Sequence, residues 1–184
     1  MCIRDRNNVP SRVQRILKVT KGRTTIQTFA FGGAQLSSFA ARPDVSTALK
    51  QTKWDVVVLQ EASISFMTSK GRKRFLRAVD WFTRNAPASA RIVLYQTWPW
   101  QAGSRYLTGQ PLNSAQMWVA MKRAYADVAE RPDLTIAPVG LCWMRSPKRR
   151  TFYSSDGIHA SLAGSRLAAS IIARTITADG PVDC

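Results

Sequence analysis

The sequence has one histidine, His159, among its 184 residues. One imidazole cannot build a His-rich metal site, and we expect no metal and no cofactor. If the protein carries out acid–base chemistry near neutral pH, this ring, with a reference pKa of about 6.5, is the natural candidate. Cysteine is also scarce: Cys2, Cys142 and Cys184 show neither C-x-x-C nor zinc-ligand spacing. A Cys142–Cys184 disulfide would require export, which the sequence alone does not establish.

The sequence also lacks long apolar runs and has few acidic residues. No run approaches the 18 or more apolar residues of a membrane span, and the first residues are too charged for a signal peptide. Eleven Asp and Glu residues face 27 Lys and Arg residues, which gives a net charge of +16. Such an excess favours contact with a polyanion or simply a soluble protein from a basic proteome. No nucleic-acid fingerprint is present, so nucleic acid is not an expected partner.

Length and composition predict one domain. A chain of 184 residues with 45% hydrophobic residues can bury a substantial core. The first six residues, Met-Cys-Ile-Arg-Asp-Arg, match nothing that follows and are similar to adaptor-derived openings of translated gene fragments. We therefore expect residues 1–6 to be a non-native leader and residues 7–184 to form the domain, with the natural N-terminus lost.

Strand-like and helix-like segments alternate along the chain. After a leading helix that begins near Asn7, the predicted strands are 24–31, 56–59, 91–96 and 134–139. The predicted helices between and after them are 34–41, 45–51, 70–85, 114–130 and 161–176, with a helical turn at 141–144. This order predicts an α/β protein in which helices cover both faces of a parallel sheet, a three-layer α/β/α fold.

The unusual residues follow the predicted strands, where sites form in such sheets. They are Gly32-Gly33, Gln60, Thr97-Trp98-Pro99, Gly140 and the segment 154–159, which holds Asp156 and His159. In the D-x-x-H pattern a carboxylate can orient one ring nitrogen and leave the other free as a base. Acyl transfer also needs donors for a developing oxyanion, and the Gly33 N–H and the Gln60 amide are candidates. The plain alternatives are a tight turn at Gly32-Gly33 and a surface glutamine.

Several segments together resemble the SGNH (GDSL-type) hydrolases, in a branch in which Gln replaces the usual Asn of the third sequence block. The resemblance covers nearly the whole chain from Asn7 onward and rests on Phe31–Leu36, Trp54–Ser63, Tyr95–Trp98, Pro138–Gly140 and Asp156–Ser161. It implies a flavodoxin-like α/β/α fold and metal-independent ester hydrolysis by a Ser-His-Asp triad. By position, His159 is the base, Asp156 its partner, and Gly33 (or Gly32) and Gln60 are oxyanion donors. Gly32, Ser63 and Trp98 are candidate substrate contacts.

The nucleophile departs from the family pattern. The family's serine ends the first strand, just before the first helix, and would fall near position 2, where this chain has Cys2. A thiol can serve as a nucleophile, but foreign sequence is the preferred interpretation of this segment. Ser11 lies too late, inside the predicted helix, and nothing marks Ser63 as activated. We therefore expect the fold to lack its first strand and the chain to lack the nucleophilic serine.

The prediction is an ester hydrolase of the carbohydrate or lipid esterase type, present as a fragment that is itself inactive. The alternatives are a catalytically inactive SGNH-like protein and a basic polyanion-binding protein, the latter supported by the clusters Lys70–Arg77 and Arg145–Arg150. The expected partner is a small-molecule or carbohydrate ester. The sequence leaves open the exact substrate, the oligomeric state and the localisation, although the family is often exported.

Overall fold

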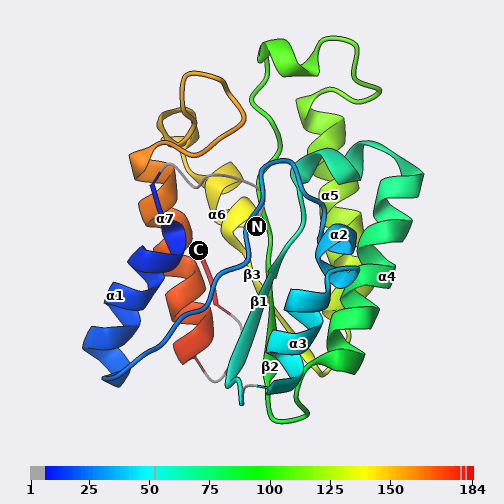
Figure 1. The fold of residues 1–184 in the computed structure, drawn as a ribbon. Helices are drawn as coiled ribbons and strands as arrows, with labels where there is room; N and C mark the ends of the chain where they lie inside the picture. Colours follow the sequence, from blue (N-terminus) through cyan, green and yellow to red (C-terminus); the bar gives the residue numbers. More distant parts are fainter. Residues whose placement is uncertain (1–6, 52, 179, 181) are drawn as a thin grey trace.

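The computed structural model describes residues 7–51, 53–178, 180 and 182–184. Its centre is a parallel sheet of β1 (Val56–Gln60), β2 (Arg91–Tyr95) and β3 (Leu134–Ala137), in the order β1-β2-β3. Each crossover between consecutive strands contains a helix, as parallel strands require. All three carboxyl ends therefore lie at one edge of the sheet, the upper edge in Figure 1.

Helices cover both faces of this sheet (Figure 1), so the expected three-layer α/β/α class is confirmed. One layer contains α1 (Val9–Lys21), α6 (Val139–Arg145) and α7 (Leu162–Thr177). The other contains α2 (Leu36–Ala40), α3 (Pro43–Gln51), α4 (Ser69–Asn85) and α5 (Ser114–Ala129). Three short 3-10 helices complete the described elements: η1 (Ser63–Met67), η2 (Arg105–Leu107) and η3 (Arg149–Phe152).

Side-chain caps fix where several helices begin. Asn8 accepts a hydrogen bond from the Ser11 N–H at the start of α1, and Ser161 accepts one from the Gly164 N–H at the start of α7. Asn113 and Gln116 form a reciprocal capping box at α5. A cap of this kind contributes about 1 kcal/mol. The start of α7 is thus fixed two residues after His159.

The predicted strand at 24–31 is absent among the described elements, and this expectation is wrong. The segment alternates in exposure only from Thr24 to Gln27, and Ile26 and Phe29 pack against the buried cores, but the segment pairs with no described strand. A β-strand is defined by its ladder of hydrogen bonds, so a β-like composition without a paired neighbour stays extended coil. The fourth predicted strand, 134–139, also ends early, because Val139 begins α6 and β3 ends at Ala137.

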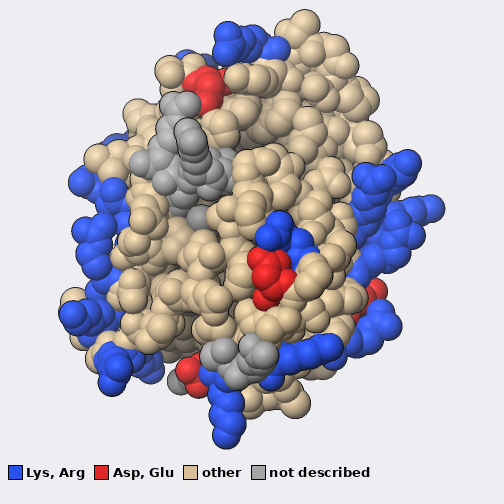
Figure 2. Space-filling view, viewed as in Figure 1, with Lys and Arg blue, Asp and Glu red and all other residues tan. Residues whose placement is uncertain are grey.

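Positive charge is distributed around the periphery of the molecule (Figure 2). Lys and Arg side chains follow both flanks and the lower end, and the face between them carries little charge. Several acidic groups are already engaged: Asp44 pairs with Arg42, and Asp80 and Asp133 both pair with Arg131. Most basic side chains therefore face solvent without a carboxylate neighbour.

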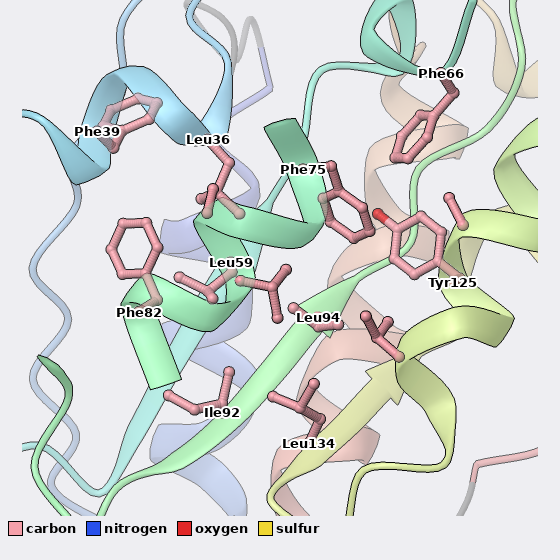
Figure 3. Close-up of a cluster of buried hydrophobic side chains, with 14 of the residues drawn as sticks. Leu36, Phe39, Leu59, Phe66, Phe75, Phe82, Ile92, Leu94, Tyr125 and Leu134 are labelled. Carbon is pink, nitrogen blue, oxygen red and sulfur yellow. The ribbon is translucent and has the colours of Figure 1, made fainter. Parts of the chain in front are cut away.

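The larger core lies between the sheet and the α2–α5 layer. Leu59, Ile92, Leu94 and Leu134 of the sheet meet aromatic rings from the helices, among them Phe75 and Tyr125 (Figure 3). Each fully buried side chain of this size contributes about 1.5–3 kcal/mol from burial alone. This packing makes the sheet a rigid platform for the loops at its carboxyl edge.

A disulfide joins Cys142 in α6 to Cys184, with a sequence separation of 42 residues. It ties the C-terminal segment to the α1–α6–α7 layer. Within the part of the chain described, no helix is both long and apolar enough to span a bilayer.

Candidate active site

Asp156 and His159 form a hydrogen-bonded pair in the loop between η3 and α7. Oδ2 of Asp156 lies 2.6 Å from Nδ1 of His159. The imidazole is about one-third exposed, whereas the carboxylate is more deeply buried. A carboxylate at Nδ1 fixes the tautomer in which Nε2 is unprotonated and able to accept a proton. Among the described residues, Nε2 itself has no hydrogen-bond partner.

The loop holds Asp156 ionised. Burial by itself would raise the pKa of this carboxyl group, but hydrogen bonds from the His159 N–H and ring, the Ile158 N–H and the Ser154 hydroxyl outweigh it and place the pKa well below its ordinary range. Three of these donors meet Oδ1, at 2.7 Å from Ser154 Oγ and 2.9 Å from each backbone nitrogen. Oδ2 is therefore left for the imidazole. The hydroxyl of Ser154 is a contact that the sequence pattern did not predict.

Gln60 and Ser63 follow β1 at the same edge of the sheet. The Ser63 hydroxyl lies 2.9 Å from both Thr97 Oγ1 and the Trp98 carbonyl oxygen, so it is engaged with β2's continuation and not with His159. The Gln60 side chain is half-buried and makes no hydrogen bond with another described residue. Its amide therefore remains available as a donor.

Trp98 connects this edge of the sheet to the loop that carries His159. Its indole N–H donates to the Ile158 carbonyl (3.1 Å), and its ring stacks on Trp143 at 3.9 Å between centroids. Only 8% of Trp98 is exposed. One face of this indole is therefore covered by Trp143 and is closed to a sugar ring. The tryptophan supports the loop that carries the proposed base.

Gly32 and Gly33 form an exposed turn before α2, and Gly33 has φ +73°, a conformation that favours glycine. The turn is fixed to the end of β1 through Glu61, which is 1% exposed. Both carboxylate oxygens of Glu61 accept from the Leu36 N–H (3.3 Å), and Oε1 also accepts from the Ala62 N–H and the Ser65 hydroxyl. Burial raises the pKa of Glu61, and these hydrogen bonds offset the rise only in part.

Glu61 was not predicted from the sequence as a site residue. The only signal was its position directly after Gln60, and its contact with residue 36 spans 25 residues. The candidate residues therefore fall into two groups, Asp156–His159 and the Gly33–Gln60–Ser63 edge. The hydrogen bonds of Trp98 and Ser63 join the groups, but no hydrogen bond joins Gly33 or Gln60 directly to His159 within the described residues.

The start of α1 also lies against the histidine loop. The Asn7 side-chain amide donates to the Ala160 carbonyl (3.2 Å) and to Ser165 Oγ (3.1 Å). Ala160 directly follows His159, so the backbone that enters α1 passes beside the proposed base. Cys2 lies outside the described residues. Across the described residues, no group of three His, Cys, Asp or Glu side chains could hold a metal ion.

No family model matches the chain, and no curated protein sequence matches it. A protein from Slackia heliotrinireducens, provisionally classed as an SGNH hydrolase, matches with a TM-score of 0.82 and 29% identity over 92% of this chain and 91% of that one.

Two more distant structures share the fold. A lipase/acylhydrolase from Enterococcus faecalis has a TM-score of 0.67 and 15% identity, over 92% of this chain and 84% of that one. A catalytic mutant of an acetylxylan esterase from Geobacillus stearothermophilus has a TM-score of 0.64 and 12% identity, over 96% and 84%. These two likenesses show a shared fold. In fold and in sequence, the chain is therefore similar to an SGNH-type hydrolase, with 29% identity to the Slackia heliotrinireducens protein.

Proposed function

We propose that this chain is the larger part of an ester hydrolase that works through a Ser-His-Asp triad. The observation that carries the proposal is the 2.6 Å contact between Asp156 and His159, with Nε2 of the ring left open at the carboxyl edge of the sheet. His159 is the general base, and Asp156 orients it and stabilises its protonated form. The Gly33 N–H and the Gln60 amide stabilise the oxyanion.

The serine belongs, in this proposal, to native sequence upstream of Asn7. Two observations support that position. Asn7 is hydrogen-bonded to Ala160, next to the base. In addition, β1 has a described neighbour on one side only, and Val58 in this strand is 42% exposed. An apolar edge strand is a natural place for a further strand to pair.

The reaction follows from these positions. The serine Oγ attacks the ester carbonyl while His159 Nε2 takes the hydroxyl proton. Collapse of the tetrahedral intermediate breaks the bond to the alcohol, which leaves with that proton. Water then attacks the acyl-serine with His159 again as base, and this step releases the acid and restores the enzyme.

The test compares this chain with a version that carries its native upstream sequence, using hydrolysis of 4-nitrophenyl acetate. The proposal predicts turnover by the extended protein, loss of that turnover in its His159→Ala variant, and no turnover by the present chain. Robust turnover by the present chain that His159→Ala abolishes would refute the upstream position of the nucleophile. An inactive extended protein would favour a degenerate member of the family.

A further inference from the structure

Five exposed basic side chains lie on the two segments that border the histidine loop. Arg105 begins η2 in the loop after β2, and the other four lie from the end of α6 into η3 (Arg145, Lys148, Arg149 and Arg150). None of them takes part in a salt bridge found in the described part of the chain. Over residues 101–112 and 145–160 the single acidic residue is Asp156, whose oxygens are already hydrogen-bonded.

The first segment is packed directly on the loop that carries Asp156. The Gln101 N–H donates to the Gly157 carbonyl (2.7 Å), and Ser104 Oγ donates to the Asp156 carbonyl (2.9 Å). A Cβ on Gly157, which has φ +72°, would lie 3.0 Å from Ser104 Cβ. The absence of a side chain at Gly157 therefore permits this close approach, and Arg105 follows immediately.

The second segment is held to the other side of the same loop. Tyr153 and Ala160 form an isolated antiparallel bridge, and the Ser154 N–H donates to the His159 carbonyl (2.8 Å). Just before the bridge, Phe152 accepts from the Ser161 N–H. Arg149 and Arg150 thus lie four and three residues before Tyr153. In Figure 1 the two segments lie at the same upper end of the molecule, above α7 and above α5.

An exposed aromatic ring accompanies the charges. Tyr106 is 38% exposed, its ring lies beside Trp100, and the Arg105 guanidinium stands 5.1 Å from its centroid. It is the single large hydrophobic side chain exposed on these two segments. One ring with a cation beside it suits a sugar that bears an acidic group. It offers neither an apolar face for a bilayer nor the series of rings on which nucleic-acid bases stack.

We propose that these five side chains and Tyr106, the basic rim, bind an acidic polysaccharide, and that the ester is an acyl group carried on that polymer. The substrate half of this inference rests on the function proposed above. The Cys142–Cys184 disulfide agrees with it, since disulfides persist in the oxidising compartments outside the cytoplasm, where such polymers occur.

Binding of polygalacturonate to the present chain tests the rim, because binding requires no nucleophile. The rim variant is Arg149→Glu/Arg150→Glu. The control is Lys18→Glu/Lys21→Glu, which changes the net charge equally but lies near the far end of α1, about 15–20 Å along the helix from the end next to Ala160. Both control side chains are exposed. Isothermal titration at about 20 mM salt gives the affinities, with the neutral polymer dextran as a second control.

The expected result is binding to polygalacturonate and not to dextran, weakened about tenfold or more by the rim variant and less than about threefold by the control. Salt at about 0.5 M should abolish it, since the Debye length then falls to a few ångströms. Equal losses in the two variants would overturn the inference in favour of a net-charge effect. Stronger binding to a DNA duplex or to phosphatidylglycerol vesicles would also overturn it.

These outcomes are independent of the catalytic proposal. Absence of binding would remove the acidic polymer as the substrate class and leave ester hydrolysis intact. Conversely, an extended protein that binds polygalacturonate but hydrolyses no ester would remove the catalytic proposal and keep the rim.

Discussion

The two carboxylate oxygens of Asp156 have different hydrogen-bond partners and different roles. Oδ1 accepts three hydrogen bonds that shape the loop, and Oδ2 meets the imidazole. The carbonyl oxygen of an asparagine can accept the same loop hydrogen bonds as Oδ1. Its NH₂ group, however, would face Nδ1 and favour the ring tautomer that carries its proton on Nε2, which cannot act as the base. In the extended enzyme, Asp156→Asn should therefore lower kcat about 10³–10⁴-fold with little change in KM or Tm. Steady-state kinetics and a thermal melt check this, and a large fall in Tm would show that the residue acts mainly on folding.

Glu61 should give the protein an unusual pH dependence. Its pKa is raised in the fold from an ordinary value of 4.5, so the folded state holds the proton more tightly than the unfolded chain does. The stability from this group is complete below the unfolded pKa and is lost as pH rises through the folded one. Relative to the wild type, Glu61→Gln should therefore gain unfolding free energy as pH rises above the ordinary value of 4.5.

Urea unfolding at a series of pH values measures this difference, with Glu130→Gln as an exposed control. The opposite result would be a Glu61→Gln protein whose unfolding free energy falls relative to the wild type as pH rises. It would mean that hydrogen bonding to Leu36, Ala62 and Ser65 outweighs the desolvation of the carboxylate. Asp156 acts in the other direction, because its lowered pKa gives stability that is lost as pH falls.

At the residue scale, the sequence predicted what is local and missed what is not. Asp156 and His159 lie three positions apart in a turn, so their pairing could be anticipated from the motif. The contacts of Glu61 with Leu36, and of Asn7 with Ala160, span 25 and 153 residues. No short pattern encodes such contacts, because they form only when the layers pack.

At the element scale, hydrophobic periodicity predicted the helices and the three paired strands within a few residues. It failed for 24–31, where composition favours a strand but the described sheet offers no partner. Burial patterns report one segment at a time, whereas a strand depends on its neighbour. The same limit explains why Val58 of β1 is exposed, although helices were predicted to cover both faces of the sheet.

The contact between α6 and the end of β2 depends on Gly140. A Cβ at this position would lie 1.9 Å from the Thr97 carbonyl oxygen and 3.2 Å from the Trp118 ring. Gly140→Ala should therefore reduce the unfolding free energy by about 1–3 kcal/mol through forced displacement of α6. Gly180→Ala, where a Cβ would meet nothing within 4 Å, is the matched control. Equal denaturation midpoints for the two variants would show that α6 shifts without penalty.

The Cys142–Cys184 disulfide should stabilise the same layer. Closing a loop with a sequence separation of 42 residues stabilises the fold by about 4 kcal/mol in the chain-entropy description. Reduction should lower Tm by roughly 10 °C for a protein of this size. A thermal melt with and without a phosphine reductant measures this change. The Cys184→Ser variant should have the lowered Tm in both conditions, because it has no disulfide to reduce. An unchanged Tm on reduction would mean that packing alone holds the C-terminal segment.

For the whole molecule, the proposed site lies where the two helical layers meet the carboxyl edge of the sheet. The α1–α6–α7 layer carries His159 on its loop, and the opposite layer carries the Gly33 turn, fixed to β1 by Glu61. The proposed base thus comes from one layer, and the proposed oxyanion donors come from the opposite layer (Gly33) and from the end of β1 (Gln60). The proposed chemistry therefore depends on how the layers pack on the sheet, and not on any single motif.

The most direct test of the central claim is to locate the nucleophile chemically. The extended protein would be treated with a fluorophosphonate, which reacts with activated serines, and the labelled residue identified by peptide mass spectrometry. The account predicts a single labelled serine upstream of Asn7, with labelling lost in His159→Ala and absent from the present chain. Labelling at Ser63, or equal labelling of the present chain, would contradict it.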